Sequence, residues 1–188
     1  MILRIVYSPA AAYDQLKDRD ILGLAIVLML IRFTGTAFNT VLAMYLRRSP
    51  MLLKPLFGLD PQTYRLYETM WYGPYGLLMI LIITFAIAQT SRRLYHRSDV
   101  TFRKSFEIIA LAFFIPWLPS VPGDWLLLTT VNAHPAFLVP FHISLLVWEC
   151  ALVSIGMQRV YGISRDHSGM LGLTAFALFI GLGGLLIR

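Results

Sequence analysis

Five long apolar runs dominate the pattern of hydrophobic and polar positions along this chain. The first, from Ile21 to Leu46, contains a single charged side chain, Arg32. At about 1.5 Å of rise per residue, a helix of this length crosses the roughly 30 Å hydrocarbon core of a bilayer. The sequence therefore predicts an all-α integral membrane protein with five transmembrane helices. The predicted spans are 21–46, 72–90, 105–119, 136–157 and 169–187.

The segment ahead of the first span, residues 1–20, is short and mixed in polarity. Ser8 and Pro9 are typical of a helix start, with Ser as the cap and Pro in the first turn. Beyond them, Leu16 falls on an apolar side and Asp14 on a polar side. We expect a small amphipathic helix lying on the membrane; a frayed tail is the alternative.

Two segments are broken by proline and glycine. Met51–Thr69 is too polar to span, so a re-entrant or interfacial segment is expected, with Asp60-Pro61 opening a helix over Gln62–Thr69. Three prolines at the end of the third span are expected to break that helix as it leaves the membrane. The following run, Trp125–Val131, is either a half-buried return or a continuation of the third helix. The three prolines are Pro116, Pro119 and Pro122.

Composition supports a membrane protein of one domain covering 1–188. Hydrophobic residues make up 57% of the 188 residues and charged residues only 14%, too few to cover a soluble surface. The net charge is +6, but the basic residues lie between apolar runs, which favours anionic lipid headgroups over nucleic acid as partners. Cys150 is the only cysteine, so an internal disulfide is excluded. The first apolar run is too long for a cleaved signal peptide.

The distribution of positive charge predicts the orientation. Ten Lys and Arg residues lie on one side of the membrane, in the head (residues 1–20) and in the loops 91–104 and 158–168. Five lie on the other side. The positive-inside rule places the N-terminus in the cytoplasm and the C-terminus outside. In the second loop, Arg92, Arg93 and Arg97 are the candidates for binding lipid headgroups.

A polar stripe inside the first span is the sharpest candidate site. Arg32, Thr36 and Asn39 follow one another at helical spacing, and His142 and Glu149 form a matching stripe in the fourth span. A charge at mid-depth in a bilayer is costly, so Arg32 and Glu149 are expected to pair between antiparallel helices. Two interpretations remain open: a pair that only fixes helix packing, and a ligand or transport site.

No catalytic residue, metal site or cofactor is predicted. The chain has no nucleophile elbow, zinc-protease, P-loop or dinucleotide motif. His134, His142 and Asp124 all lie toward the outer side, but the histidine spacing crosses two prolines and does not fit a metal site. Glu107 is expected to pair with Arg103 or Lys104 on its own helix.

Small residues are frequent in the last span. Ala177 and Gly181 are four positions apart, a spacing that permits close helix approach. Such a face serves either an internal contact or a homo-oligomer. The glycines of this span are Gly169, Gly172, Gly181, Gly183 and Gly184.

Three short motifs, taken in order along the chain, resemble the Yip1 family of five-span membrane proteins. Tyr7–Tyr13 (YSPAAAY) is similar to the family's entry before the first span. Thr101–Arg103, followed by an apolar helix to Ile115-Pro116, resembles its third-span pattern, and Gln158–Ser164 resembles the connector before the last span. One departure is Arg97-Ser98, where a glycine pair is common.

The resemblance implies a non-enzymatic protein that acts in membrane organisation or in trafficking-type partner binding. The short head is similar to that of prokaryotic relatives, which implies a multi-pass protein of the prokaryotic cytoplasmic membrane. The alternative is a small transporter or channel that uses the polar cluster of Arg32, Asn39, His142 and Glu149. A membrane enzyme is the least supported class.

Overall fold

The computed structural model describes residues 7–186 of the chain, with the side chain of Leu186 excluded. Within this range all regular structure is helical. The helices are α2 (Pro9–Leu16), α3 (Leu22–Thr36), the π-helical turn η1 (Ala37–Val41), α4 (Leu42–Leu46), the 3-10 turn η2 (Leu56–Gly58), α5 (Pro61–Leu94), α6 (Phe102–Val131), α7 (Pro135–Tyr161) and α8 (Arg165–Leu186). Five of these segments are long and apolar enough to span a membrane, with α3, η1 and α4 forming one of them. The predicted fold class is confirmed.

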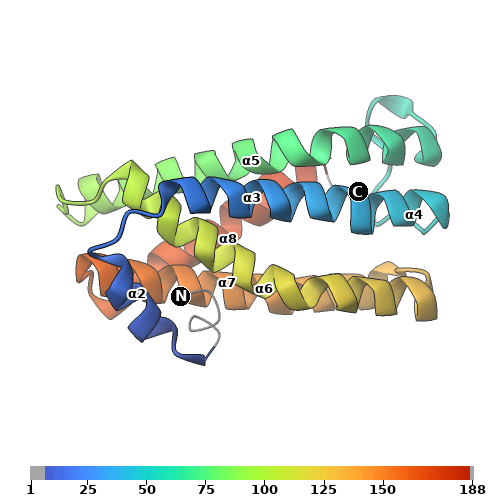
Figure 1. Cartoon of the computed structure of the whole chain (residues 1–188). Coiled ribbons are helices and arrows are strands. Elements are labelled where there is room, and N and C mark those ends of the chain that lie inside the picture. The colour runs from blue at the N-terminus through green and yellow to red at the C-terminus, as the bar shows by residue number, and fades with distance from the viewer. Residues whose placement is uncertain (1–6, 187–188) are drawn as a thin grey trace.

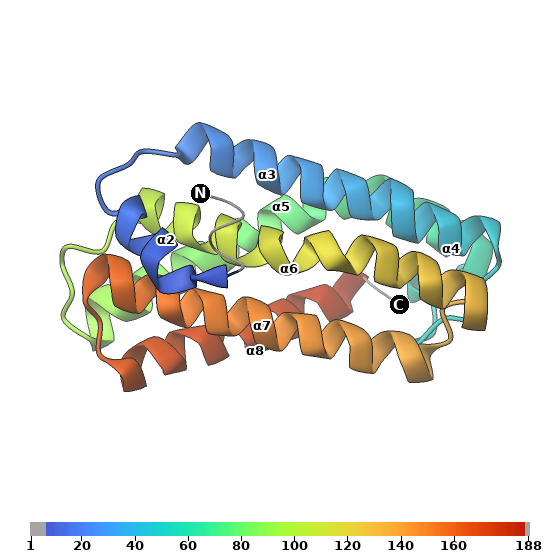
Figure 2. The same ribbon diagram turned by 60° about the horizontal axis from the view of Figure 1, so that its bottom comes forward.

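The long helices run up and down in one elongated bundle (Figures 1 and 2). One end holds α2, the connection 95–101 and the connection 162–164; the other end holds the loop 47–60 and the turn 132–134. Helix α6 packs against α3, α5 and α7, and α8 packs against α5 and α7. The central stretch of α6, including Ile108 and Phe113, is fully buried.

The outer surface of the bundle is apolar. Large hydrophobic side chains are exposed along the outer helices, among them Leu30 on α3, Phe85 on α5, Val147 on α7 and Leu173 on α8. In water such a continuous apolar surface would be unfavourable, whereas lipid chains cover it without cost. The chain is therefore a multi-pass membrane protein.

Helix α5 is much longer than the second predicted span. It begins at Pro61, where Asp60 caps it by accepting hydrogen bonds from the backbone N–H groups of Gln62 and Thr63, both at 3.0 Å. Hydrogen bonds from Thr63 and Gln62 hold the pKa of Asp60 below its usual range. The predicted cap is confirmed, but the helix it opens continues without interruption into the span, so only 47–60 remains as a loop.

Helix α6 passes through all three of its prolines, so the predicted break at the end of the third span is wrong. The helix continues to Val131, and Trp125–Val131 is its last part. In lipid a helix satisfies almost all of its backbone hydrogen bonds internally, so a proline that removes one bond still leaves the helix as the best conformation.

The head helix α2 forms as predicted, but its apolar face is turned to the protein. Ala12, Tyr13 and Leu16 are buried, and α2 packs against α7. The ring of Tyr13 lies over Gly156, where a Cβ atom would come within 3.0 Å of it. The expectation that this face lies on the membrane is therefore wrong.

The last two spans are slightly displaced from their predicted bounds. Helix α7 extends to Tyr161 and ends at Gly162, whose positive φ of 64° suits glycine. Helix α8 begins earlier than expected, at Arg165. Arg4, Ile187 and Arg188, which enter the predicted head, last span and charge count, lie outside the described residues. The orientation stays a prediction.

Candidate functional site: a polar cavity inside the bundle

Arg32 and Glu149 form an ion pair in the interior of the bundle. Nη2 of Arg32 on α3 lies 2.7 Å from Oε1 of Glu149 on α7, and the two side chains are 9% and 4% exposed. The predicted pairing is confirmed. The attraction between the two charges offsets most of the desolvation free energy that each alone would cost in a low-dielectric interior.

Three aromatic rings surround the guanidinium of Arg32. Its central carbon lies 5.6 Å from the ring centre of Phe33, 5.2 Å from Phe113 and 5.9 Å from Phe179. Nη1 of Arg32 has no hydrogen-bond partner within the described part of the chain. The negative ring faces partly replace that partner through cation–π attraction. Helices α3, α6, α7 and α8 thus all meet at this one side chain.

A second buried ion pair lies at the start of α5. Nη1 of Arg65 is 2.6 Å from Oε2 of Glu68, one helical turn later, and both side chains are almost fully buried. Nη2 of Arg65 also donates to the carbonyl of Pro50, at 3.4 Å. This pair attaches the loop 47–60 to α5. The sequence analysis treated Arg65 only as a loop charge.

Asp124 joins three helices. Thr40 in the π-helical turn donates to Oδ2 of Asp124 at 2.8 Å, and Nε2 of His142 on α7 lies 2.8 Å from Oδ1. The Asp124 side chain is 3% exposed, whereas that of His142 is 44% exposed. Gly123-Asp124 is a pair typical of turns, but here it lies inside α6, and this position brings Asp124 into the site.

These three clusters line one cavity of about 410 Å³. It extends from Arg32 and Glu149 toward the loop 47–60 and the start of α7, and Leu52, Leu138, Ile143 and Ile180 are among its apolar walls. Its charged, histidine and threonine lining is Arg32, Thr36, Thr40, Arg65, Glu68, Asp124, His142 and Glu149. A mainly apolar cavity with a few converging polar groups is the usual form of a ligand site.

The predicted stripe of the first span is only partly in this cavity. Thr36 lines it and accepts a 2.9 Å hydrogen bond from Nε1 of Trp117. Asn39 is exposed and does not line the cavity. The π-helical turn Ala37–Val41 rotates the helix, so that Thr40 faces inward instead.

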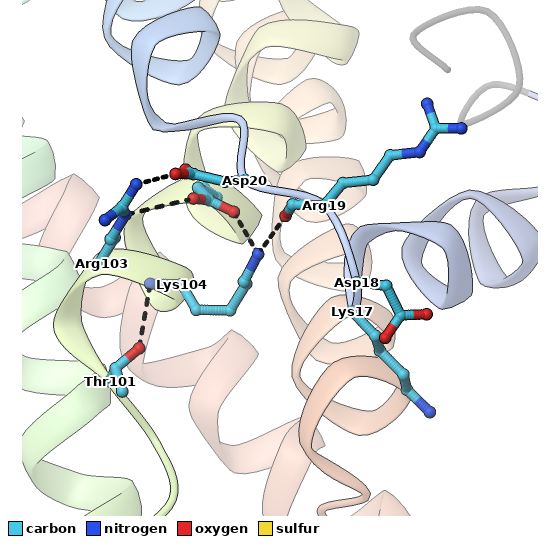
Figure 3. Close-up of a pocket in the computed structure, with 8 residues that line it drawn as sticks. Lys17, Asp18, Arg19, Asp20, Thr101, Arg103 and Lys104 are labelled. Carbon is cyan, nitrogen blue, oxygen red and sulfur yellow. Dashed lines mark hydrogen bonds and ion pairs between the residues drawn. The ribbon is translucent and has the colours of Figure 1, made fainter.

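The opposite end of the bundle carries a charged cluster between the head and α6 (Figure 3). Nη2 of Arg103 pairs with Oδ2 of Asp20, and Nζ of Lys104 lies 2.6 Å from Oε2 of Glu107. Lys104 also donates to the backbone carbonyls of Leu16 and Arg19, at 3.1 and 2.5 Å. The predicted Glu107 pairing is confirmed, and the cluster fastens the head to α6.

The shallow pocket of about 350 Å³ at this cluster is lined by the same charged groups. Hydrogen bonds from Arg103 and from the Leu22 N–H hold the pKa of Asp20 below its usual value. The Lys17 and Arg19 side chains point away from Arg103 and Lys104 (Figure 3). The cluster is thus mostly neutralised internally.

The three arginines expected at lipid headgroups have different surroundings. Arg93 is exposed. Arg92 is also exposed, but its Nε donates to the carbonyl of Val100 at 2.6 Å. Arg97 forms two 2.9 Å hydrogen bonds with Asp99 and also donates to the carbonyl of Tyr161. Arg97 mainly closes the α5–α6 connection, and its hydrogen bonds to Asp99 lower the pKa of that carboxyl.

Metal-ligating side chains do not gather in the described part of the chain, where no group of three or more His, Cys, Asp or Glu residues could hold an ion. His134 caps α7, its Nδ1 accepting from the N–H of Ala136 at 3.3 Å. His142 and Asp124 come together, but His134 does not join them. The sequence alone placed all three only on the same side.

The glycines of α8 face in two directions. Gly172 packs directly on α7, where a Cβ atom would lie 2.6 Å from the carbonyl oxygen of Cys150. Gly181 has nothing within 4 Å of such an atom, and both it and Ala177 are exposed. The first glycine makes an internal contact and the second leaves an open face.

Comparison with known proteins gives one match. The family model described as the Yip1 domain matches residues 3–187, nearly the whole chain. No curated protein and no solved structure matches this chain.

Proposed function

This chain belongs to the Yip1 family of multi-pass membrane proteins, and from that membership we propose that it organises its membrane by binding partner proteins, without catalysing a reaction. A family sets the fold more firmly than the activity, so the role has to rest on surfaces of this chain. The surface that supports it best is the open face of α8.

That face has the geometry of a helix–helix contact. Ala177 and Gly181 are exposed one helical turn apart, between the exposed side chains of Leu173 and Leu185. Helices in lipid associate through small residues that let their backbones approach closely. The partner we propose is a second copy of this chain, docking α8 against α8.

The end of the bundle that holds α2 and the connections 95–101 and 162–164 is basic, as expected for a surface that contacts the cytoplasmic leaflet. Exposed positive side chains there include Lys17, Arg93, Arg159 and Arg165. Each basic residue near an anionic membrane surface contributes about 1 kcal/mol of attraction. We propose that this end binds anionic headgroups on the cytoplasmic side, and that the protein resides in the cytoplasmic membrane of a prokaryote.

Self-association is measurable in lipid. Donor- and acceptor-labelled protein is reconstituted together, and energy transfer is followed as the protein is diluted with lipid. We expect Gly181→Leu to lower the association constant at least about tenfold, because the branched side chain separates the helices. Gly23→Leu is the matched control, since Gly23 is also exposed with open space around it but lies on α3. No transfer in the parent protein, or equal transfer in both variants, would contradict the proposal.

The cavity supports a second candidate, a small transporter or channel. Arg32, His142 and Glu149 all line it, although Asn39 does not. Liposome flux assays with small anions, cations and metal ions test this role. Transport requires flux that Glu149→Gln abolishes, and absence of flux for every solute removes the candidate.

A further inference from the structure

The cavity has an unequal number of fixed charges. Among its lining residues, three carboxylates face two guanidinium groups. Arg32 pairs with Glu149 at 2.7 Å and Arg65 pairs with Glu68 at 2.6 Å. The third carboxylate, Asp124, has no arginine or lysine partner within the described residues.

The immediate partners of Asp124 are Thr40 and His142, each at 2.8 Å. A neutral histidine leaves the cavity with one uncompensated negative charge, which is costly away from water. Either of two cations balances it: a proton on His142, or a positive group brought by a ligand.

The apolar side chains that line the cavity determine which kind of cation it can bind. Leu52, Leu138, Ile143 and Ile180 present apolar surface to the same cavity as Asp124, and a bare metal ion would find too few ligands there. An anionic ligand would add to the excess of negative charge, because Arg32 and Arg65 are each already paired with a carboxylate. A molecule with one ammonium group and an apolar body satisfies both the charge and the walls.

The site is accessible from one side of the bundle. Helix α8 ends before the level at which α4, α6 and α7 end or begin (Figure 2). Its last turns contribute Gly183 and Gly184 to the cavity lining, and neither glycine has a side chain to close it. The His142 side chain, which lines the cavity, is 44% exposed.

We propose that this cavity binds an amphiphilic amine, with Asp124 as the counter-ion of its ammonium group. The site goes beyond the partner-binding role, since self-association through α8 and amine binding can fail independently of each other. The ammonium group binds this carboxylate beside Thr40 and His142.

Other charged or titratable groups also face this position. They are Arg32 from α3, Arg65, Glu68 and Tyr72 from α5, and Glu149 from α7; the part of α8 that lines the cavity contributes none. Because Arg32 and Arg65 are each held by a carboxylate, Asp124 is the carboxylate of this cavity left to bind the ammonium group.

The test uses octylamine, with octanol and octanoate as neutral and anionic analogues of the same length. Binding to the full chain in nanodiscs of a zwitterionic lipid is measured by calorimetry near neutral pH. We expect octylamine to bind at least about tenfold more tightly than either analogue. Equal binding of octanol, or tighter binding of octanoate, would overturn the proposal.

One variant and a matched control locate the site. Asp124→Asn should weaken octylamine binding at least about tenfold, whereas Asp99→Asn, at the opposite end of the bundle, should leave it unchanged. Equal losses in the two variants would contradict the proposal. If Asp124→Asn does not fold, the comparison of octylamine with octanol and octanoate in the parent protein decides alone.

Discussion

The hydroxyl of Thr40 donates a 2.8 Å hydrogen bond to Oδ2 of Asp124, and a π-helical turn makes this contact possible. The turn Ala37–Val41 inserts an extra residue into the first span. Without it, the α-helical spacing from Arg32 and Thr36 would bring Asn39 toward the cavity. π-Helical turns inside α-helices are often found at functional sites, and this one faces the cavity.

Thr40→Val should destabilise the protein while Asn39→Ala should not. Valine keeps the shape of Thr40 but leaves one oxygen of a buried carboxylate without its donor, which costs about 1–3 kcal/mol. Asn39 is exposed, so its truncation should stay within about 0.5 kcal/mol. Chemical unfolding in mixed micelles measures both. Equal effects of the two substitutions would mean that the Thr40–Asp124 hydrogen bond contributes nothing.

Hydropathy was sufficient to predict the helices but not their ends. The apolar runs gave five spans and the partner of Arg32, because length and the cost of a lone charge in lipid are properties of the sequence itself. The predicted end of the third helix, at the prolines that begin with Pro116, was wrong. A proline in a soluble protein favours a break in a helix. In lipid, backbone N–H and C=O groups without hydrogen bonds are so costly that the helix continues.

The remaining part of the cavity depends on packing that no local pattern contains. Asp124 follows a glycine that is typical of a turn, and Thr40 looks like any threonine in a span. The i, i+3 spacing of Arg65 and Glu68 was a usable signal inside the predicted helix Gln62–Thr69, but no local pattern indicated that this helix continues into the second span. Long-range contacts to α7 and the π-helical turn bring these residues together.

The two faces of α8 should respond oppositely to alanine. Gly172→Ala places a Cβ atom 2.6 Å from the Cys150 carbonyl oxygen and also against Ser154, so we expect a loss of about 1–3 kcal/mol. Gly181→Ala meets open space and should be neutral or stabilising by up to about 1 kcal/mol, because alanine favours the helix. The free energy of unfolding of each variant, measured on monomeric protein in detergent, distinguishes the two effects. A tolerated Gly172→Ala would show that α7 and α8 do not pack this closely.

Tyr13 should contribute to stability through its ring and not through its hydroxyl. The side chain is fully buried between α2 and α7, and its Oη has no hydrogen-bond partner in the described part of the chain. Burial accordingly raises the pKa of this phenol. Tyr13→Ala should cost about 3–5 kcal/mol, as for other large aromatic truncations in a core.

Tyr13→Phe is the matched control and should be neutral or slightly stabilising, since it removes only the unpaired polar group. Thermal unfolding in detergent measures both variants. A Tyr13→Phe loss comparable to that of Tyr13→Ala would contradict the docked position of the head.

The Asp20–Arg103 pair predicts an acid-sensitive attachment of the head. The hydrogen bond from Arg103, together with that from the Leu22 N–H, lowers the pKa of Asp20 below 3.8. A carboxylate with a depressed folded-state pKa stabilises the fold fully above its unfolded value, and this contribution disappears as the pH falls through the folded value.

Asp20→Asn should therefore lower Tm near neutral pH, and its difference from the parent protein should disappear as the pH falls through the lowered folded-state pKa of Asp20. Because both side chains are exposed, the effect should be small and should weaken in salt. Asp18→Asn is the control, since Asp18 forms no ion pair within the described residues. A Tm difference that persists at low pH would exclude an ionic origin.

The most direct test of the account is a double-mutant cycle on Arg32 and Glu149, measured by chemical unfolding in mixed micelles. Arg32→Gln or Glu149→Gln alone leaves one buried charge without its partner and should cost about 3–5 kcal/mol. The double variant removes both charges and should cost clearly less than the sum, with a coupling energy of about 0.5–3 kcal/mol. Strictly additive losses, within about 0.3–0.5 kcal/mol, would show that the two side chains do not pair inside the membrane.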